Sequence, residues 1–161
     1  MFLQTALAAA LTLCQPYYDA KLALHGYRSC DGRVATAPQY TVAEPFGKGG
    51  IAAVVDAQGW AYINRRGEVV IRPFIVDNGP DGFSDGLARY TEGGKFGFFN
   101  ISGAVVIAAQ FEFAYPFDKG RAKVGEGCTS VSDGEHTRID CRAWRLIQKP
   151  PSHSHQRAKD A

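Results

Sequence analysis

The 161-residue sequence has no large excess of charge of either sign, and this limits the partners that electrostatics alone could select. Eighteen lysine and arginine residues are nearly balanced by sixteen aspartate and glutamate residues, which leaves a formal net charge of +2. Nucleic acids and anionic membrane surfaces attract proteins with a strong basic excess. We therefore expect no nucleic-acid partner.

The sequence also has no apolar run long enough to cross a bilayer, which takes roughly 20 residues. Its longest run, Phe2 to Cys14, has the length of a signal-peptide core instead, although no lysine or arginine precedes it. We predict that residues 1–20 are a signal peptide cleaved after Ala20, and that the mature protein is periplasmic or secreted. Three alternatives stay open: a mis-called start codon, a buried N-terminal helix, and a lipoprotein lipidated at Cys14, although Leu13 stands where a small residue belongs.

Cysteine is scarce as well, with four residues, and no second pair accompanies Cys128 and Cys141 to complete a zinc site. We predict a disulfide between these two, which would close a loop of about 14 residues and stabilise the fold by roughly 3 kcal/mol. Cys14 leaves with the predicted leader, so Cys30 has no obvious partner. It could be a free thiol, pair with Cys14 if that residue is retained, or form an intermolecular bridge.

Glycine and aromatic residues, in contrast, are frequent and regularly spaced. Gly32, Gly67 and Gly103 lie 35 and 36 residues apart, and similar residues recur around each of them. The recurring residues are His25, Trp60 and Phe96 seven positions before; Tyr27, Tyr62 and Phe98 five before; Val34, Val69 and Val105 two after; and Pro38, Pro73 and Ala109 six after. A second pattern also recurs, in which a phenylalanine is followed by a glycine and then an alanine. Its phenylalanines are Phe46, Phe83 and Phe117. Self-similarity at this period predicts a repeat architecture.

The repeat predicts a three-stranded antiparallel meander in each unit. In the second unit, residues 60–64 form a strand, residues 65–67 a turn that ends in glycine, and residues 68–72 the return strand. A further strand at residues 51–56 precedes this hairpin. Such a unit is too small to bury its apolar face alone. We therefore predict an all-β fold in which the meanders stack in a solenoid- or propeller-like array.

We predict that the repeat domain spans residues 21–149 and that a disordered tail follows at residues 150–161. The units are residues 25–59, 60–95 and 96–143, with a partial capping unit at residues 144–149. The third unit contains an insertion at residues 125–140 that includes Cys128 and Cys141. We predict that this insertion is a disulfide-closed hairpin that caps the stack.

These motifs resemble the WG-repeat family, whose units centre on a Trp-Gly or similar pair. Residues 60–67 and 96–103 match the aromatic-Ile/Val-Asn/Asp-x-x-Gly turn that follows this pair, and residues 83–88 match the phrase Phe-Ser-x-Gly-Leu-Ala. The resemblance covers residues 25–149, although no literal Trp-Gly pair occurs and each unit keeps only half of it. It implies a β-rich repeat with interaction roles, and it brings no catalytic residues.

Two groups of charged residues in the second unit are candidates for binding a partner. The basic group is Arg65, Arg66, Arg72 and Arg89, and the acidic group is Asp77, Asp81 and Asp85. The basic group would suit an acidic partner, and a solvated turn is the alternative. The acidic loop has Gly79 and Ala88 where a calcium loop needs its third and twelfth ligands, so ordinary turn chemistry explains it.

We predict a non-enzymatic exported module that mediates protein–protein interaction in the cell envelope, with no metal, cofactor or catalytic residue. A module that binds glycan or peptidoglycan is the alternative, because Trp60 and Trp144 could stack on sugar rings. A hydrolase would have to use His136 with Asp133 and Glu135, but no spacing places a nucleophile beside them.

Overall fold

The computed structural model describes residues 11–132, 134 and 136–151, and within these ranges the chain forms strands and turns with no helix. The strands are β1 (Leu13–Asp19), β2 (Leu24–Ser29), β3 (Val42–Ala43), β4 (Ile51–Asp56), β5 (Gly59–Asn64), β6 (Val69–Ile71), β7 (Ile75–Val76), β8 (Gly79–Pro80), β9 (Leu87–Glu92), β10 (Lys95–Asn100), β11 (Val105–Phe111), β12 (Phe113–Ala114), β13 (Arg121–Ser132) and β14 (Thr137–Gln148). The predicted all-β class is confirmed. The described part of the chain accordingly has no apolar helix that could span a membrane.

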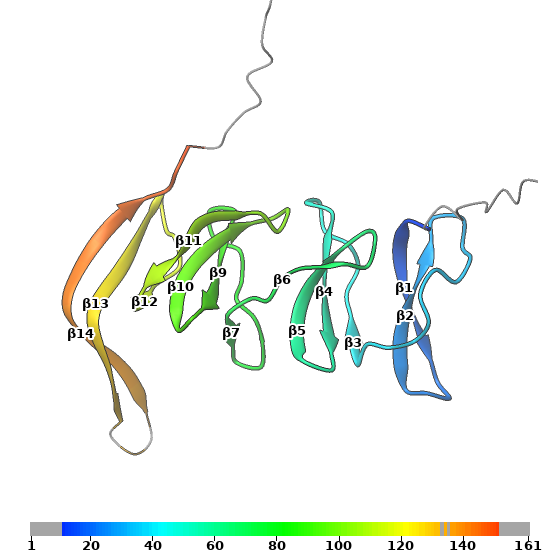
Figure 1. The fold of residues 1–161 in the computed structure, drawn as a ribbon, viewed down its shortest axis with the longest axis horizontal. Coiled ribbons are helices and arrows are strands. Elements are labelled where there is room, and N and C mark those ends of the chain that lie inside the picture. The colour runs from blue at the N-terminus through cyan, green and yellow to red at the C-terminus, as the bar shows by residue number, and fades with distance from the viewer. Residues whose placement is uncertain (1–10, 133, 135, 152–161) are drawn as a thin grey trace, which may run out of the picture.

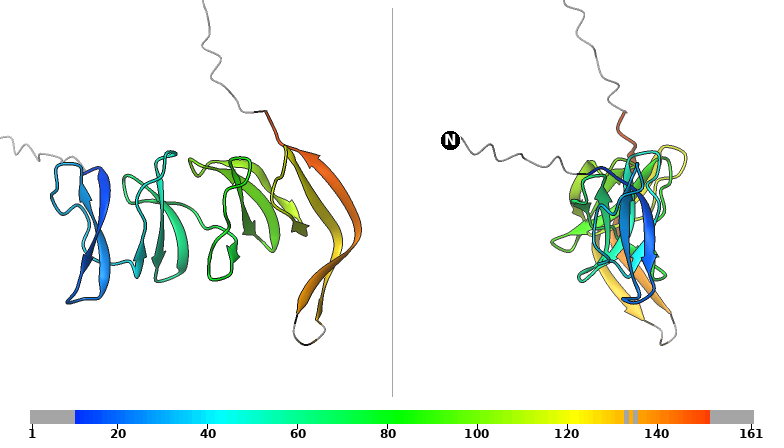
Figure 2. Two further views of the ribbon diagram at one scale, coloured as in Figure 1. Left: turned by 180° about the vertical axis from the view of Figure 1, so that it is seen from behind. Right: turned by 90° about the vertical axis from the view of Figure 1, so that its right-hand side faces the viewer.

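The strands form small antiparallel sheets that stand side by side in a row (Figures 1 and 2). In chain order the sheets are β1-β2, β3-β4-β5-β6, β7-β8, β9-β10-β11 and β12-β13-β14. The sheet of β1 and β2 lies at one end of the row, and the long hairpin of β13 and β14 lies at the other (Figure 1).

The predicted meanders are present as β4-β5-β6 and β9-β10-β11. Their hairpin turns close where Gly67 and Gly103 adopt φ angles of +79° and +82°, a region that glycine enters without steric cost. Each glycine N–H donates to the carbonyl of Asn64 or Asn100 at 2.9 Å. The side-chain oxygens of these asparagines accept further backbone N–H groups of the same turn, which explains why asparagine recurs there.

The first meander starts earlier than predicted, at β1. This strand pairs with β2 from Leu13↔Ser29 to Asp19↔Leu24, just as β4 and β9 pair with β5 and β10. The predicted leader boundary at Ala20 therefore falls between two paired strands, and cleavage there would remove β1 from the sheet. Residues 1–10 of the predicted leader and residues 152–161 of the predicted tail lie outside the described residues.

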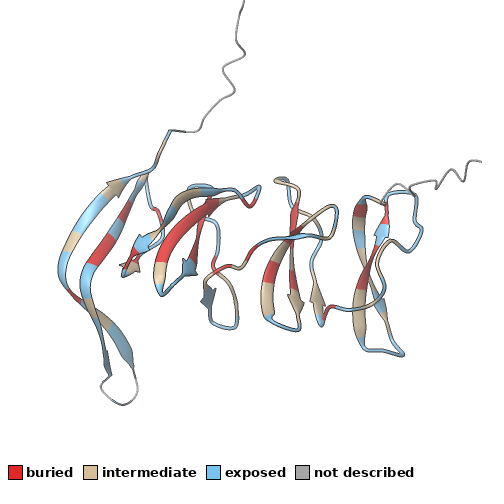
Figure 3. Ribbon diagram, in the orientation of Figure 1, coloured by how far each residue is buried: buried red, intermediate tan, exposed pale blue. Residues whose placement is uncertain are grey.

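Aromatic rings hold neighbouring sheets together at equivalent positions. Tyr27 packs against Phe46 with ring centroids 5.3 Å apart, Tyr62 against Phe83 at 5.9 Å, and Phe98 against Phe117 at 4.7 Å. The two recurring sets of aromatic residues in the sequence therefore pack against each other. In each unit, the phenylalanine of the following loop covers the tyrosine or phenylalanine of the preceding sheet. Inner strands such as β10 are consequently buried on both faces, whereas β14 is largely exposed (Figure 3).

A disulfide lies in each terminal sheet. Cys128 and Cys141 face each other across β13 and β14, so the predicted insertion is a disulfide-closed hairpin. Cys14 and Cys30 form the second disulfide. Of the three alternatives open for Cys30, the structure shows the pairing with Cys14, because β1 belongs to the folded domain.

Candidate interaction surface

Arg89 and Asp81, two of the predicted binding residues, are buried together. The Asp81 carboxylate accepts hydrogen bonds from Nε and Nη2 of Arg89 at 2.8 and 2.9 Å and from its backbone N–H at 3.0 Å. The Nη1 atom of Arg89 donates to the carbonyl of Ala114 in β12 at 2.8 Å. The pair joins the loop before β9 to the last sheet. Because the two side chains are only 8% and 7% exposed, they are not available to a partner.

Arg65 also serves the stacking of the sheets. Its Nη1 atom donates to the carbonyl of Leu13 at 3.0 Å, and its guanidinium lies 4.7 Å from the ring centroid of Phe46. The Leu13 N–H donates in return to the carbonyl of Arg65 at 2.8 Å. The turn between β5 and β6 is thereby docked on the first sheet.

Arg66 and Arg72 each pair with a carboxylate of their own sheet. Arg66 meets exposed Glu68 at 2.8 Å, and Arg72 meets Asp56 at 2.7 Å while also donating to the carbonyl of Trp60 at 3.3 Å. Hydrogen bonds from these arginines lower the pKa of Glu68 and of Asp56 below their usual values. The pairs keep the net charge of this surface low.

Asp77 and Asp85 occupy turns with left-handed backbone, at φ angles of +48° and +53°. Asp77 is exposed at the tip between β7 and β8. The Asp85 carboxylate accepts the N–H of Gly120 at 2.7 Å and so links two successive covering loops. The seven predicted binding residues are therefore not gathered in one site. Arg66, Asp77 and Asp85 stay exposed, Arg65 and Arg72 are partly buried, and Asp81 and Arg89 are buried.

A row of valines at equivalent positions of the repeat is exposed. The valines recur in the sequence, but the sequence does not show that they lie on the surface. Val34, Val69 and Val105, two positions after each repeat glycine, are 54%, 48% and 52% exposed. Val69 begins β6 and Val105 begins β11, and both strands are edges of their sheets. An apolar side chain is thus presented at the same place in each of three units.

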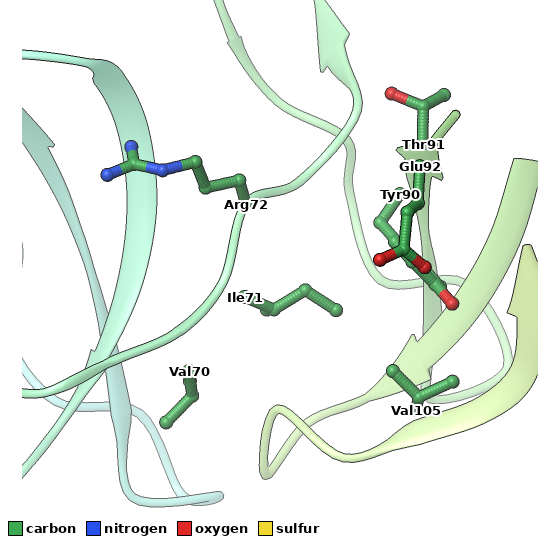
Figure 4. A pocket seen from close by; sticks show the side chains of 7 residues that line it. All are labelled: Val70, Ile71, Arg72, Tyr90, Thr91, Glu92 and Val105. Carbon is green, nitrogen blue, oxygen red and sulfur yellow. The ribbon is translucent and has the colours of Figure 1, made fainter. Parts of the chain in front are cut away.

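A groove of about 310 Å³ lies beside this row, between the edge strand β6 and the sheet of β9 to β11 (Figure 4). Its lining residues are Val70, Ile71, Arg72, Tyr90, Thr91, Glu92 and Val105. Val70, Ile71 and Val105 bring aliphatic side chains from two sheets to the groove, and its lining also includes polar residues. The groove can therefore accept an apolar side chain from an extended segment.

Aromatic side chains also gather on the last sheet. The rings of Tyr115 and Trp144 lie 5.6 Å apart and tilted by 37°, and the Nζ atom of Lys123 lies 4.5 Å from the Trp144 ring centroid. Trp60, the other tryptophan, instead donates its indole N–H to the carbonyl of Asn78 at 2.9 Å. The two tryptophans do not form a common platform.

Groups that could support catalysis or metal binding are not assembled in the part of the chain that the structure describes. No cluster of three or more His, Cys, Asp or Glu residues is present there that could hold a metal ion. His25, at the aromatic repeat position, packs against Tyr18 with ring centroids 5.0 Å apart. Asp133 and Glu135, the acids considered beside His136, lie outside the described residues.

Stacked meanders with a recurring turn define a β-repeat module. A sequence profile described as "WG containing repeat" matches residues 31–56, 60–96 and 96–127, which is more than half of the chain. The chain therefore belongs to the WG containing repeat family, a family of non-catalytic repeat modules, and the resemblance seen in the sequence is confirmed. Comparison with curated proteins and comparison with solved structures each found no match.

Proposed function

We propose that this protein is a non-enzymatic β-repeat module that binds another protein in the cell envelope. The observation that carries the proposal is the row of exposed valines on successive units, Val34, Val69 and Val105. Edge strands carry unpaired backbone N–H and C=O groups that can pair with an extended segment of a partner. The valines and the neighbouring groove would add side-chain contacts to the same partner segment. These contacts would recur once per repeat unit.

The envelope location is proposed on the two disulfides, because such bonds persist in oxidising compartments and are rare in the cytosol. A leader that leaves the first sheet intact must end before Leu13, since β1 begins there. Intact-mass measurement of the protein purified from an envelope fraction tests both points. A mature chain that starts after Ala20, or a protein with four free thiols, would contradict this part of the proposal.

Site-specific photo-crosslinking tests the binding surface. A crosslinker placed at Val69 should capture one recurrent protein in envelope preparations, and Val105→Glu on the neighbouring unit should abolish the capture. The matched control is Val131, which is 37% exposed but lies on the terminal hairpin. If both positions captured the same proteins, or if Val105→Glu had no effect, the valine row would not be the binding surface.

Glycan binding is a second candidate, favoured by the Tyr115–Trp144 pair on the last sheet. Aromatic faces of this kind can stack on sugar rings. Titration with soluble cell-wall fragments should then change the tryptophan emission in a saturable way, and Trp144→Ala should remove the response. An unchanged emission at millimolar fragment would exclude this candidate.

A further inference from the structure

The last sheet presents a face that is covered in every other unit. Leu146 pairs with Lys123, the third residue of β13, just as Phe98 pairs with the third residue of β9. Phe98 is 0% exposed because Phe117 of the following loop covers it, whereas Leu146 is 60% exposed. Leu146 therefore occupies the position of a stacking residue that lacks its covering ring.

The surroundings of Leu146 extend this apolar surface. Side chains two residues apart on a strand share a face, which places Trp144 beside Leu146. Trp144 contacts Tyr115, and Tyr115 is itself exposed. The result is a patch of one aliphatic and two aromatic side chains on one face of the sheet of β12, β13 and β14. This sheet lies at the end of the row (Figure 1).

The rim of this patch is basic. Lys123 and Arg121 lie opposite Leu146 and Gln148 on the same face, and all four are exposed. Among the residues that the structure describes, no ion pair involves Lys123 or Arg121, and the Nζ atom of Lys123 lies over the Trp144 ring. The uncovered face therefore carries positive charge that no carboxylate of these ion pairs neutralises.

The segment that follows the last sheet in this sequence has no side chain like the covering phenylalanines. Residues 152–161 contain no phenylalanine, tyrosine, tryptophan, leucine, isoleucine or valine. A second copy that used the same face would bring its own cations against these and be repelled. An acidic partner is favoured instead, because its carboxylates would pair with the basic rim.

We propose that the outer face of the last sheet is an open repeat interface that binds an acidic protein segment carrying an aromatic side chain. The aromatic ring covers Leu146 as Phe117 covers Phe98, and flanking carboxylates meet Lys123 and Arg121. This proposal rests on the protein-binding function above and assigns it a second site and a partner chemistry.

The chain itself provides the probe. Its covering segment at residues 80–87, Pro-Asp-Gly-Phe-Ser-Asp-Gly-Leu, combines one phenylalanine with two aspartates. A cyclised peptide of this sequence is titrated into the full chain carrying Trp60→Phe, so that Trp144 is the only tryptophan. A saturable blue shift of the Trp144 emission is expected, and it should weaken when salt is raised because the rim is charged.

Three variants test the geometry. Leu146→Glu on the protein and a peptide with alanine in place of its phenylalanine should each weaken binding by about tenfold or more. Lys123→Glu should also weaken binding, whereas Val131→Glu on the same hairpin should not. Equal binding by the alanine peptide, or no saturable shift at millimolar peptide, would overturn the proposal.

Two further outcomes would reassign the face. A saturable response to the anionic glycan polygalacturonate but not to the peptide would make it a glycan site. Concentration-dependent self-association in sedimentation velocity, lost in Leu146→Glu, would make it a contact between copies. Crosslinking at Val69 that persists in Leu146→Glu, with no peptide binding, would leave the proposed function standing and remove only this second site.

Discussion

Removal of the charge of Asp81 should destabilise the protein severely, because Arg89 would be left buried without its counter-ion. In Asp81→Asn, three hydrogen bonds to the carboxylate lose their charged acceptor, and the carbonyl of Ala114 remains as the other partner of the guanidinium. Breaking a buried ion pair from one side costs about 3–5 kcal/mol. With a urea m-value of about 1–3 kcal/mol/M, the unfolding midpoint should fall by more than about 1 M.

The assay is urea unfolding followed by circular dichroism, with Glu68→Gln as the control. Glu68 pairs with Arg66 on the surface, where solvent screens the charges and such a pair contributes little to stability. The double variant Asp81→Leu/Arg89→Met should recover much of the loss, since paired apolar replacements leave no unpaired charge. If Asp81→Asn and Glu68→Gln shifted the midpoint equally, the pair would not be the buried link described above.

Three other predictions concern the packing, the phenols and the first sheet. A Cβ at Gly49 would overlap the carbonyl of Ile101, so Gly49→Ala should lower the free energy of unfolding by about 1–3 kcal/mol, while Gly47→Ala, with no atom nearer than 3.7 Å, should change it little in the same urea assay. Burial raises the pKa of Tyr27 above its ordinary value, so its contribution to stability is complete below about pH 10 and lost above it. The melting temperature should therefore fall less steeply with pH above pH 10 in Tyr27→Phe than in the unmodified protein. An equal slope in the two proteins would refute this. Cys30→Ser should expose the first sheet to limited proteolysis before the others, and an unchanged cleavage order would show that this disulfide is dispensable.

The hairpins were predictable because their determinants are local. A glycine with positive φ and an asparagine three residues before it specify the turn, and both recur in the sequence at fixed spacing. The first strand was not predictable in the same way. Leu13 and its neighbours have the composition of a leader core, and only the pairing of β1 with β2 distinguishes the two interpretations.

The candidate site was harder to predict than the fold. Charged residues are usually exposed, so Arg89 and Asp81 were assigned to the surface from sequence. Their burial depends on β12 supplying the carbonyl of Ala114, a contact 25 residues away along the chain. The valines recur visibly in the sequence, yet the pattern does not tell whether Val69 points inward or outward, because that depends on which strand forms the sheet edge.

The two disulfides have a consequence for how the molecule comes apart. In a row of units that contact only their neighbours, each terminal unit has a single supporting interface and would fray first. Here the terminal units are the ones that carry a covalent crosslink. While the bonds are intact, each terminal sheet is held closed by its own crosslink, and its unfolding costs more than that of an end unit without one. Reduction removes this protection at both ends together, so the lifetime of the protein against proteases is coupled to the redox state of its surroundings.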